Sequence, residues 1–180
     1  MKIGVLSDTH GSLHYFDKAM EILKDCDYIL HGGDVLYHGP RNPLPEGYNP
    51  KELSKKINNI NNIIFTQGNC DADVDQMVID HPIQSPYVFT QLGNLKILLC
   101  HGYKQDKKEL VEMAKKFNAD LFIYGHTHIK ELYRDGGLIV LNPGSISLPK
   151  DNTHSVAVID DNSLTLIDIN NNEVIKELNR

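Results

Sequence analysis

The 180-residue sequence contains little cysteine, and its cysteines form no recognisable pattern. Cys26, Cys70 and Cys100 are odd in number, and none of them belongs to a CxxC spacing. A disulfide framework and a zinc knuckle both need paired or clustered cysteines, so neither is indicated. We expect Cys26 and Cys100 to pack as small core side chains.

Long apolar runs are also absent. No stretch approaches the roughly 18 apolar residues that a membrane-spanning helix requires. Residues 1–6 lead directly into a short apolar segment, without the apolar core of a signal peptide. We therefore expect no membrane association and a cytoplasmic location.

Positive charge is not concentrated anywhere in the sequence. The formal net charge is -6, and Lys and Arg form only short pairs such as Lys55-Lys56. This argues against binding of duplex nucleic acid but is compatible with one phosphorylated substrate held by metal ions. Hydrophobic residues make up 41% and charged residues 23%, as in globular proteins. The length predicts a single domain over residues 1–180.

Short apolar runs alternate with helical patterns through most of the chain. Strands are expected over residues 3–6, 28–30, 63–67, 95–100 and 121–124, and later over 138–141, 156–159, 164–169 and 174–178. Helices are expected after the capping residues Ser12 and Asp106, and over residues 51–60 after Pro50. Residues 36–50 are rich in Pro and Gly and predict irregular structure. The order indicates a mixed α/β domain with βαβ units first and antiparallel strands last.

Five polar clusters follow the expected strands: Asp8-Thr-His10, Gly33-Asp34, Gly68-Asn69, His101-Gly102 and Gly125-His126-Thr-His128. In open α/β sheets, ligands bind at the carboxyl ends of the strands, so these clusters should meet at one edge. Their carboxylates, amide and imidazoles suit divalent transition metals. The donors suffice for two ions, and two ions about 3.5–4 Å apart form the clamp that phosphatases and nucleases use.

In this order, the blocks DTH, GD, GN, HG and GHTH resemble those of the calcineurin-like metallophosphoesterases. The segments HGPRNPLPEGY, GNCDADVDQM, YGHTH and NPGSISLPK are similar to the YfcE-type phosphodiesterases of bacteria, over nearly the whole chain. The resemblance implies a four-layer αββα sandwich with a dimetal site at one edge. It also makes a homo-oligomer plausible.

The resemblance also implies a ligand set. The first metal would take Asp8, His10 and His128, the second Asn69, His101 and His126, and Asp34 would bridge both together with a hydroxide. Asp34, Asn69 and His126 would be the catalytic residues of this set. Manganese is the favoured metal by resemblance, although nitrogen and oxygen ligands also accept Fe, Co, Ni or Zn.

Three further residues are candidates for substrate binding. Cys70 follows Asn69 where the wider superfamily has a histidine, which leaves the protonation of the leaving group and the role of Asp71 open. Arg41 has a planar fork that can hold a phosphate, but it can equally be a solvated loop residue. His38 opens the HGPRN segment shortly after Asp34. The segment 142–145 is either a support for the GHTH loop or a plain turn.

These expectations favour a metal-dependent phosphodiesterase that acts on a small phosphodiester by in-line attack of the bridging hydroxide. The main alternative is a catalytically weak scaffold for protein–protein interaction, since a retromer subunit has this fold. The presence of all four ligand histidines disfavours that alternative. A zinc β-lactamase-like hydrolase is disfavoured because its HxHxDH block is missing.

Overall fold

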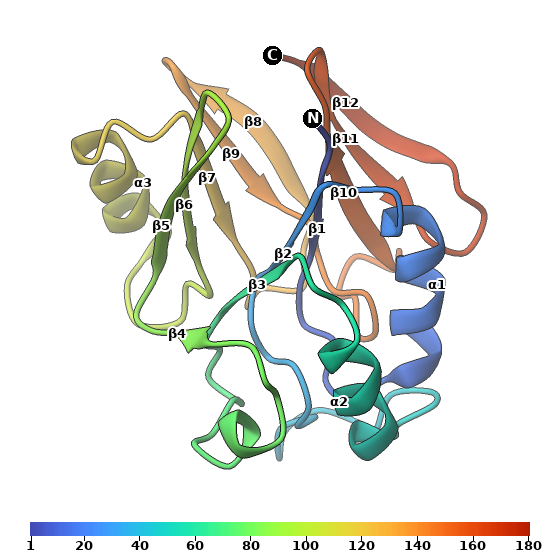
Figure 1. The fold of residues 1–180 in the computed structure, drawn as a ribbon. Coiled ribbons are helices and arrows are strands. Elements are labelled where there is room, and N and C mark those ends of the chain that lie inside the picture. Colours follow the sequence, from blue (N-terminus) through green and yellow to red (C-terminus); the bar gives the residue numbers. More distant parts are fainter.

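The computed structural model describes residues 1–180 and consists of two β-sheets that face each other, with helices on their outer faces (Figure 1). Helices α1 (Leu13–Leu23) and α2 (Pro50–Asn58) cover the sheet that contains the N-terminal strands. Helix α3 (Lys107–Lys116) covers the other sheet. The layers therefore follow the order αββα, which confirms the predicted sandwich.

The larger sheet has seven strands in the order β12-β11-β10-β1-β2-β3-β4. Their bounds are β1 Ile3–Leu6, β2 Tyr28–His31, β3 Ile63–Thr66, β4 Ile83–Gln84, β10 Ser155–Ile159, β11 Ser163–Asp168 and β12 Val174–Asn179. Strands β1 to β4 are parallel, whereas β10 to β12 form an antiparallel meander beside β1. The predicted change from βαβ units to antiparallel strands is found in this sheet.

The smaller sheet has five strands in the order β5-β6-β7-β9-β8. Their bounds are β5 Val88–Leu92, β6 Leu95–Cys100, β7 Leu121–Tyr124, β8 Glu131–Asp135 and β9 Leu138–Asn142. The three central strands are parallel, and the two edge strands run antiparallel to their neighbours. Strands β4, β5 and β8 were not predicted from the sequence.

Side-chain caps set where the helices begin. The Ser12 hydroxyl accepts from the backbone N–H of Tyr15 at 3.2 Å, and the Asp106 carboxylate accepts from that of Glu109 at 2.8 Å. Helix α2 begins at Pro50, one residue earlier than predicted, because Pro suits the first helical turn. A short 3₁₀ helix, η1, covers Asp75–Met77. No helix has the length and apolar character needed to cross a membrane.

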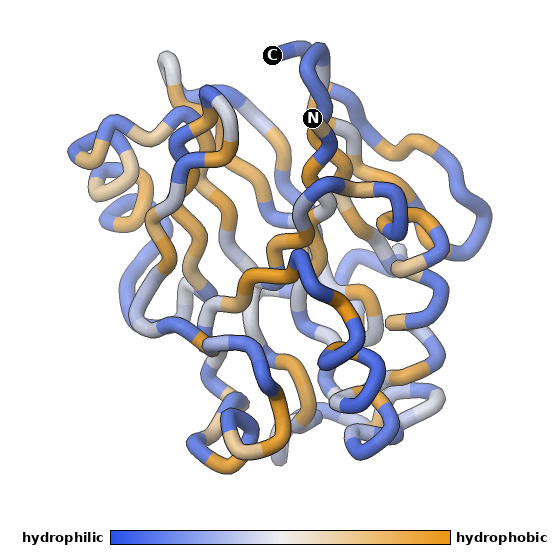
Figure 2. The backbone as a smooth tube through the Cα atoms, viewed as in Figure 1, coloured by the Kyte–Doolittle hydropathy of each residue, from blue (hydrophilic) through white to orange (hydrophobic).

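Three hydrophobic cores hold the four layers together. The core between the two sheets contains 17 buried residues, among them Val5, Leu99 and Ile123. Phe65 lies in the core beneath α1 and α2, and Phe122 lies in the core beneath α3. Apolar residues accordingly run along the strands, while the outer loops are largely hydrophilic (Figure 2). Both faces of each sheet are packed, so the central strands hold the loops that follow them in fixed positions.

Candidate metal centre

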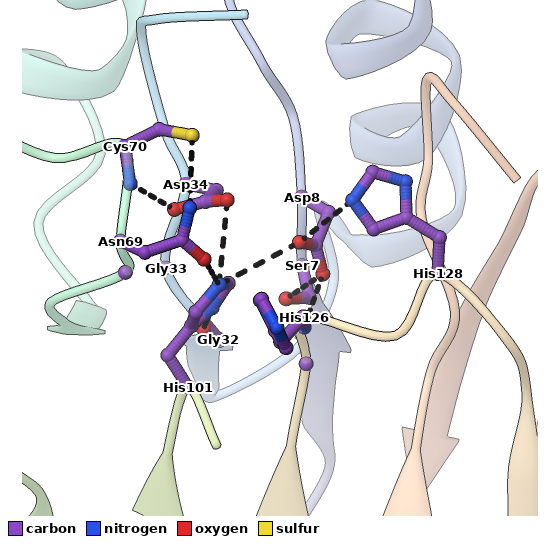
Figure 3. A network of polar contacts seen from close by, with 12 residues as sticks. Ser7, Asp8, Gly32, Gly33, Asp34, Asn69, Cys70, His101, His126 and His128 are labelled. Atoms are coloured by element: carbon purple, nitrogen blue, oxygen red, sulfur yellow. Dashed lines mark hydrogen bonds and ion pairs between the residues drawn. The ribbon is translucent and has the colours of Figure 1, made fainter. Parts of the chain in front are cut away.

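The predicted ligands come from loops at the carboxyl ends of five strands, which meet between the two sheets (Figure 3). The larger sheet supplies Asp8 and His10 after β1, Asp34 after β2 and Asn69 after β3; the smaller supplies His101 after β6, and His126 and His128 after β7. The structure thus places all of the predicted ligand residues at one edge of the sandwich.

Three of the histidines are oriented by backbone carbonyl groups. The Nδ1 atom lies 2.9 Å from the Tyr37 oxygen in His10, 2.6 Å from the Gly32 oxygen in His101 and 2.6 Å from the Leu148 oxygen in His128. A carbonyl oxygen only accepts hydrogen bonds, so Nδ1 carries the hydrogen in each ring. In the neutral rings, each Nε2 therefore turns a lone pair toward the centre, as in histidines that bind metals.

The inward-facing nitrogen and oxygen atoms lie so close together that their lone pairs repel one another unless a cation or a proton lies between them. The Nε2 atoms of His10 and His128 are 3.1 Å apart, and Nε2 of His128 is 3.2 Å from Asp8 Oδ1. Nε2 of His101 is 3.3 Å from Asp34 Oδ2. Asp8 Oδ1 is buried without a hydrogen-bond donor, an arrangement that is costly for a charged oxygen. These donor atoms therefore fit a divalent cation.

The pKa shifts reflect the same concentration of negative charge. Burial alone would lower the pKa of His101, but its hydrogen bond to Asp34 and the charges of Asp8 and Asp34 raise that pKa to about 9. Burial alone would raise the pKa of Asp8, but His128, His101 and His10 hold it well below its usual range. The carboxylates thus attract positive charge into the centre, and a metal ion would supply it.

Five of these residues adopt an unusual backbone conformation. Positive φ angles occur at Asp8 (54°), His10 (47°), Asp34 (58°), His126 (66°) and His128 (59°). The other non-glycine residues with positive φ are all asparagines, which tolerate this region well. Each costs roughly 1–2 kcal/mol relative to ordinary backbone. Backbone strain of this kind is concentrated at functional sites, where contacts with surrounding residues maintain the strained conformation.

Backbone and side-chain contacts maintain the loop after β1. The backbone N–H of Asp8 donates to the Gly33 carbonyl at 3.0 Å, and that of His10 donates to the Asp34 carbonyl at 2.9 Å. The second oxygen of Asp8, Oδ2, accepts from the Ser7 hydroxyl at 2.6 Å and from the His126 N–H at 3.1 Å. The loops after β1, β2 and β7 are therefore tied directly to one another.

Asp71, whose role the sequence left open, ties the loops after β2 and β3 together. Its carboxylate accepts hydrogen bonds from the backbone N–H groups of Asp34 (2.8 Å), Val35 (2.7 Å) and Gly68 (2.7 Å). Burial raises its pKa to about 6, against the lowering effect of these donors. Asp71 thus fixes the backbone that presents Asp34.

His31, at the end of β2, is a buried histidine that the sequence analysis did not identify. Its Nδ1 accepts from the Gly33 N–H at 3.1 Å, so its Nε2 carries the hydrogen and donates it to the Thr9 hydroxyl 2.8 Å away. Burial lowers its pKa to about 3 and keeps the ring neutral. His31 therefore joins the loops after β1 and β2 from behind the predicted ligands.

The segment 142–147 supports two of the loops, in agreement with the first of its two predicted roles. The Asn142 amide donates to the Gly125 carbonyl at 2.9 Å and to the Thr127 hydroxyl at 3.0 Å. The Ser145 and Ser147 hydroxyls both donate to the Asp8 carbonyl, at 2.7 and 3.0 Å. This segment thus holds the GHTH loop and the DTH loop in place.

Asn69 and His126 occupy the more open side of the centre. Asn69 is exposed, and its Oδ1 lies 3.2 Å from Nε2 of His101. The ring of His126 is half-buried, with its centroid 5.2 Å from that of His101. Both residues can therefore reach a metal ion and the solvent-facing cleft.

An open cleft of about 780 Å³ adjoins the centre, and its lining includes Asp34, Asn69, Cys70, His126 and His128. Its outer wall includes Arg41 and Lys150, which bring positive charge to an otherwise acidic region. Lys150 was not singled out from the sequence, although it ends the NPGSISLPK segment.

Two of the predicted substrate-binding residues, Arg41 and Cys70, line this cleft. His38 is not among the lining residues. Its ring instead lies against the rings of Tyr37 and Tyr48, with centroids 4.8 and 5.4 Å away. The structure therefore places Arg41 and Cys70, but not His38, on the wall of the cleft.

Comparison with known proteins agrees with this geometry. The family model of the calcineurin-like phosphoesterase superfamily domain matches residues 1–163. The chain is 35% identical to phosphodiesterase YfcE of Escherichia coli (strain K12) over 182 residues, covering 99% of this chain and 97% of the relative. It is 31% identical to phosphodiesterase MJ0936 of Methanocaldococcus jannaschii over 154 residues, or 80% and 83% of the two chains.

Solved structures give the same result. The structure of YfcE from E. coli superposes with a TM-score of 0.86 at 33% identity, covering 99% of this chain and 98% of that one. Vacuolar protein sorting 29 from Cryptosporidium parvum superposes with a TM-score of 0.71 at 21% identity, covering 99% and 98%, which shows a shared fold alone. On its sequence, fold and close relatives, this chain belongs to the calcineurin-like phosphoesterase superfamily.

Proposed function

We propose that this protein is a metal-dependent phosphodiesterase that holds two divalent cations. The observation that supports the proposal most strongly is the unpartnered Asp8 Oδ1 among the inward-facing Nε2 atoms of His10, His101 and His128. Relatives named phosphodiesterases and metallophosphoesterases support a hydrolase of phosphoesters.

The proposed ligand set follows the geometry and the family resemblance together. Ligand atoms of Asp8, His10 and His128 lie within 4.8 Å of one another, and so do those of Asp8, Asp34 and His101. In our proposal the first group holds one ion, Asn69, His101 and His126 hold the other, and Asp34 contributes to both. Manganese is our favoured metal, and these nitrogen and oxygen donors also accept Fe, Co, Ni or Zn.

When bound, two such ions lower the pKa of a coordinated water toward neutral pH and offset charge on the phosphoryl oxygens. The remaining contributions come from the chain itself. The buried carboxylates of Asp8 and Asp34 fix the centre, while Arg41 and Lys150 bring positive charge to the wall against which a phosphodiester would lie. The size of the cleft admits a small diester beside the proposed ligands.

A scaffold without catalytic activity is the alternative, because Vacuolar protein sorting 29 shares the fold. That likeness is at 21% identity and concerns the fold alone. Positive φ at five residues around a buried, unpartnered carboxylate oxygen is typical of a functional site and favours the enzyme. The enzyme therefore accounts for more of the structure.

The proposal is tested with Asp34→Asn and a matched control, Asp25→Asn, which removes one carboxylate charge at an exposed position. We expect the native protein and Asp25→Asn to hydrolyse a bis-aryl phosphodiester in Mn²⁺, and to lose this activity after chelation. Asp34→Asn should lose most activity even in Mn²⁺, because the shared position must carry charge to hold two cations. Full activity in the chelated native protein would refute the proposal.

A further inference from the structure

The thiol of Cys70 lies beside the proposed ligands, although the family resemblance assigns it no role in metal binding. Ligand atoms of His10, Asp34 and Cys70 all lie within 4.8 Å of one another. His10 and Asp34 are buried and Cys70 is half-buried at the wall of the cleft. The sulfur is therefore close enough to join a cation that these two residues hold.

Surrounding contacts keep the sulfur in this position (Figure 3). The Cys70 backbone N–H donates to Asp34 Oδ1 at 2.7 Å, and the Asn69 amide lies 3.2 Å from Sγ. Gly39 covers the sulfur from the opposite loop, where an added Cβ would come within 2.9 Å of Sγ. Gly39 also has a φ of +81°, which side chains disfavour. Both this conformation and the contact with Sγ therefore favour glycine at position 39. The thiol is thus confined between this loop and the centre.

The sulfur differs in chemistry from every other donor at the site. Nitrogen and oxygen donors accept manganese, whereas thiolate sulfur selects softer metals such as zinc. No cationic side chain pairs with Cys70; burial and Asp34 instead raise the pKa of its thiol to about 12.

We propose that Cys70 Sγ completes a site with His10 and Asp34 for a thiophilic divalent cation, such as Zn²⁺ or Cd²⁺. This inference rests on the proposed function, because His10 and Asp34 belong to the proposed metal centre. Binding breaks the S–H bond, leaves its electron pair on sulfur to form the bond to the cation, and releases the proton to the buffer. Manganese leaves the thiol intact, so the identity of the metal changes the ligand set.

The test is a titration of the metal-stripped protein with Cd²⁺, followed by the ultraviolet sulfur-to-cadmium charge-transfer band. We expect the native protein and Cys26→Ala, which alters a thiol in the core beneath α1, to develop a saturable band. Cys70→Ser and Cys70→Ala should develop none. Their affinity for Cd²⁺ should fall by about tenfold or more, since loss of a group that merely supports a ligand already costs 10–100-fold.

Binding of Mn²⁺ separates this inference from the function on which it rests. Cys70→Ser and Cys70→Ala should bind Mn²⁺ as tightly as the native protein, which also shows that both variants fold. Saturable binding of Cd²⁺ by the native protein without a sulfur band, or a band that persists in Cys70→Ser, would overturn the inference while leaving the proposed function intact. A native protein that binds neither Mn²⁺ nor Cd²⁺ would overturn both.

Discussion

At the scale of single residues, the hydrogen bond at Nδ1 distinguishes the histidines of this protein. In His10, His101 and His128, Nδ1 donates to a backbone carbonyl and Nε2 faces the centre. In His31 the roles are reversed, because Nδ1 accepts from a backbone N–H and Nε2 donates to Thr9. One residue type thus supplies three candidate ligands that are oriented through Nδ1, and also a structural link between two loops.

Asp71 offers a direct test of how one side chain supports the centre. In Asp71→Asn, an NH₂ group replaces one acceptor oxygen and faces backbone N–H groups. We expect a loss of about 1–3 kcal/mol in the free energy of unfolding, the cost of leaving a buried donor unsatisfied. Affinity for Mn²⁺ should fall 10–100-fold, as when other supports of metal ligands are removed. Denaturant titration and equilibrium dialysis measure the two effects.

Asp73→Asn is the matched control for this prediction, because Asp73 is exposed two residues away. It should change stability by no more than about 0.5 kcal/mol, which is usual for surface substitutions. If Asp71→Asn behaves like Asp73→Asn, the hydrogen bonds of Asp71 do not hold the Asp34 loop.

At the scale of elements, the turns that follow the strands decide where the ligands lie. Gly33 has a φ of +94°, and an added Cβ would lie 2.6 Å from the Gly68 nitrogen and 2.9 Å from His101 Nδ1. The turn after β2 therefore passes against the turn after β3 in the same sheet and against the turn after β6, which comes from the other sheet. Only a residue without a side chain permits this approach.

Gly33→Ala should be far more harmful than an alanine at another glycine with positive φ. Gly136 has a φ of +63° and open space where its Cβ would be, so Gly136→Ala isolates the backbone cost of roughly 1–2 kcal/mol. Gly33→Ala adds overpacking and should lose about 2–5 kcal/mol in total, together with Mn²⁺-dependent hydrolysis. Equal losses in the free energy of unfolding for the two variants would show that the close approach of the turns is unimportant.

Pattern alone located the central elements well, but it missed three of the four edge strands. Strands β1, β6 and β7 have the predicted bounds because a largely apolar run marks a strand that is buried on both faces over most of its length. Strands β4, β5 and β8 escaped prediction because edge strands mix exposed polar residues with buried ones. Helix α2 ends at Asn58 rather than at residue 60, within the usual uncertainty of helix ends.

Only part of the candidate site could be predicted from the sequence, because some of its features depend on contacts that leave no local sequence pattern. The residue types and their positions at strand ends predicted that the seven ligands would converge. The positive φ angles at Asp8, His10 and Asp34 could not be predicted, because neither residue type requires them. The supporting roles of His31 and Asp71 depend on contacts between loops that are distant in sequence, and no local pattern records such contacts.

At the scale of the whole molecule, the candidate centre joins the two sheets. Asp8, His10, Asp34 and Asn69 follow strands of the larger sheet, whereas His101, His126 and His128 follow strands of the smaller one. The core between the sheets fixes their spacing, so the predicted ligands meet only when both sheets are packed. The net charge is -6, and Arg41 and Lys150 give the cleft positive charge against this background.

The most direct measurement of the central claim is a titration of the metal-stripped protein with Mn²⁺, in which bound metal and hydrolysis of a bis-aryl phosphodiester are recorded at each addition. Our account predicts about two ions bound per chain at saturation, with hydrolysis appearing as the second ion binds. Full hydrolysis before any metal has bound, or saturation with no hydrolysis of any phosphodiester, would contradict it.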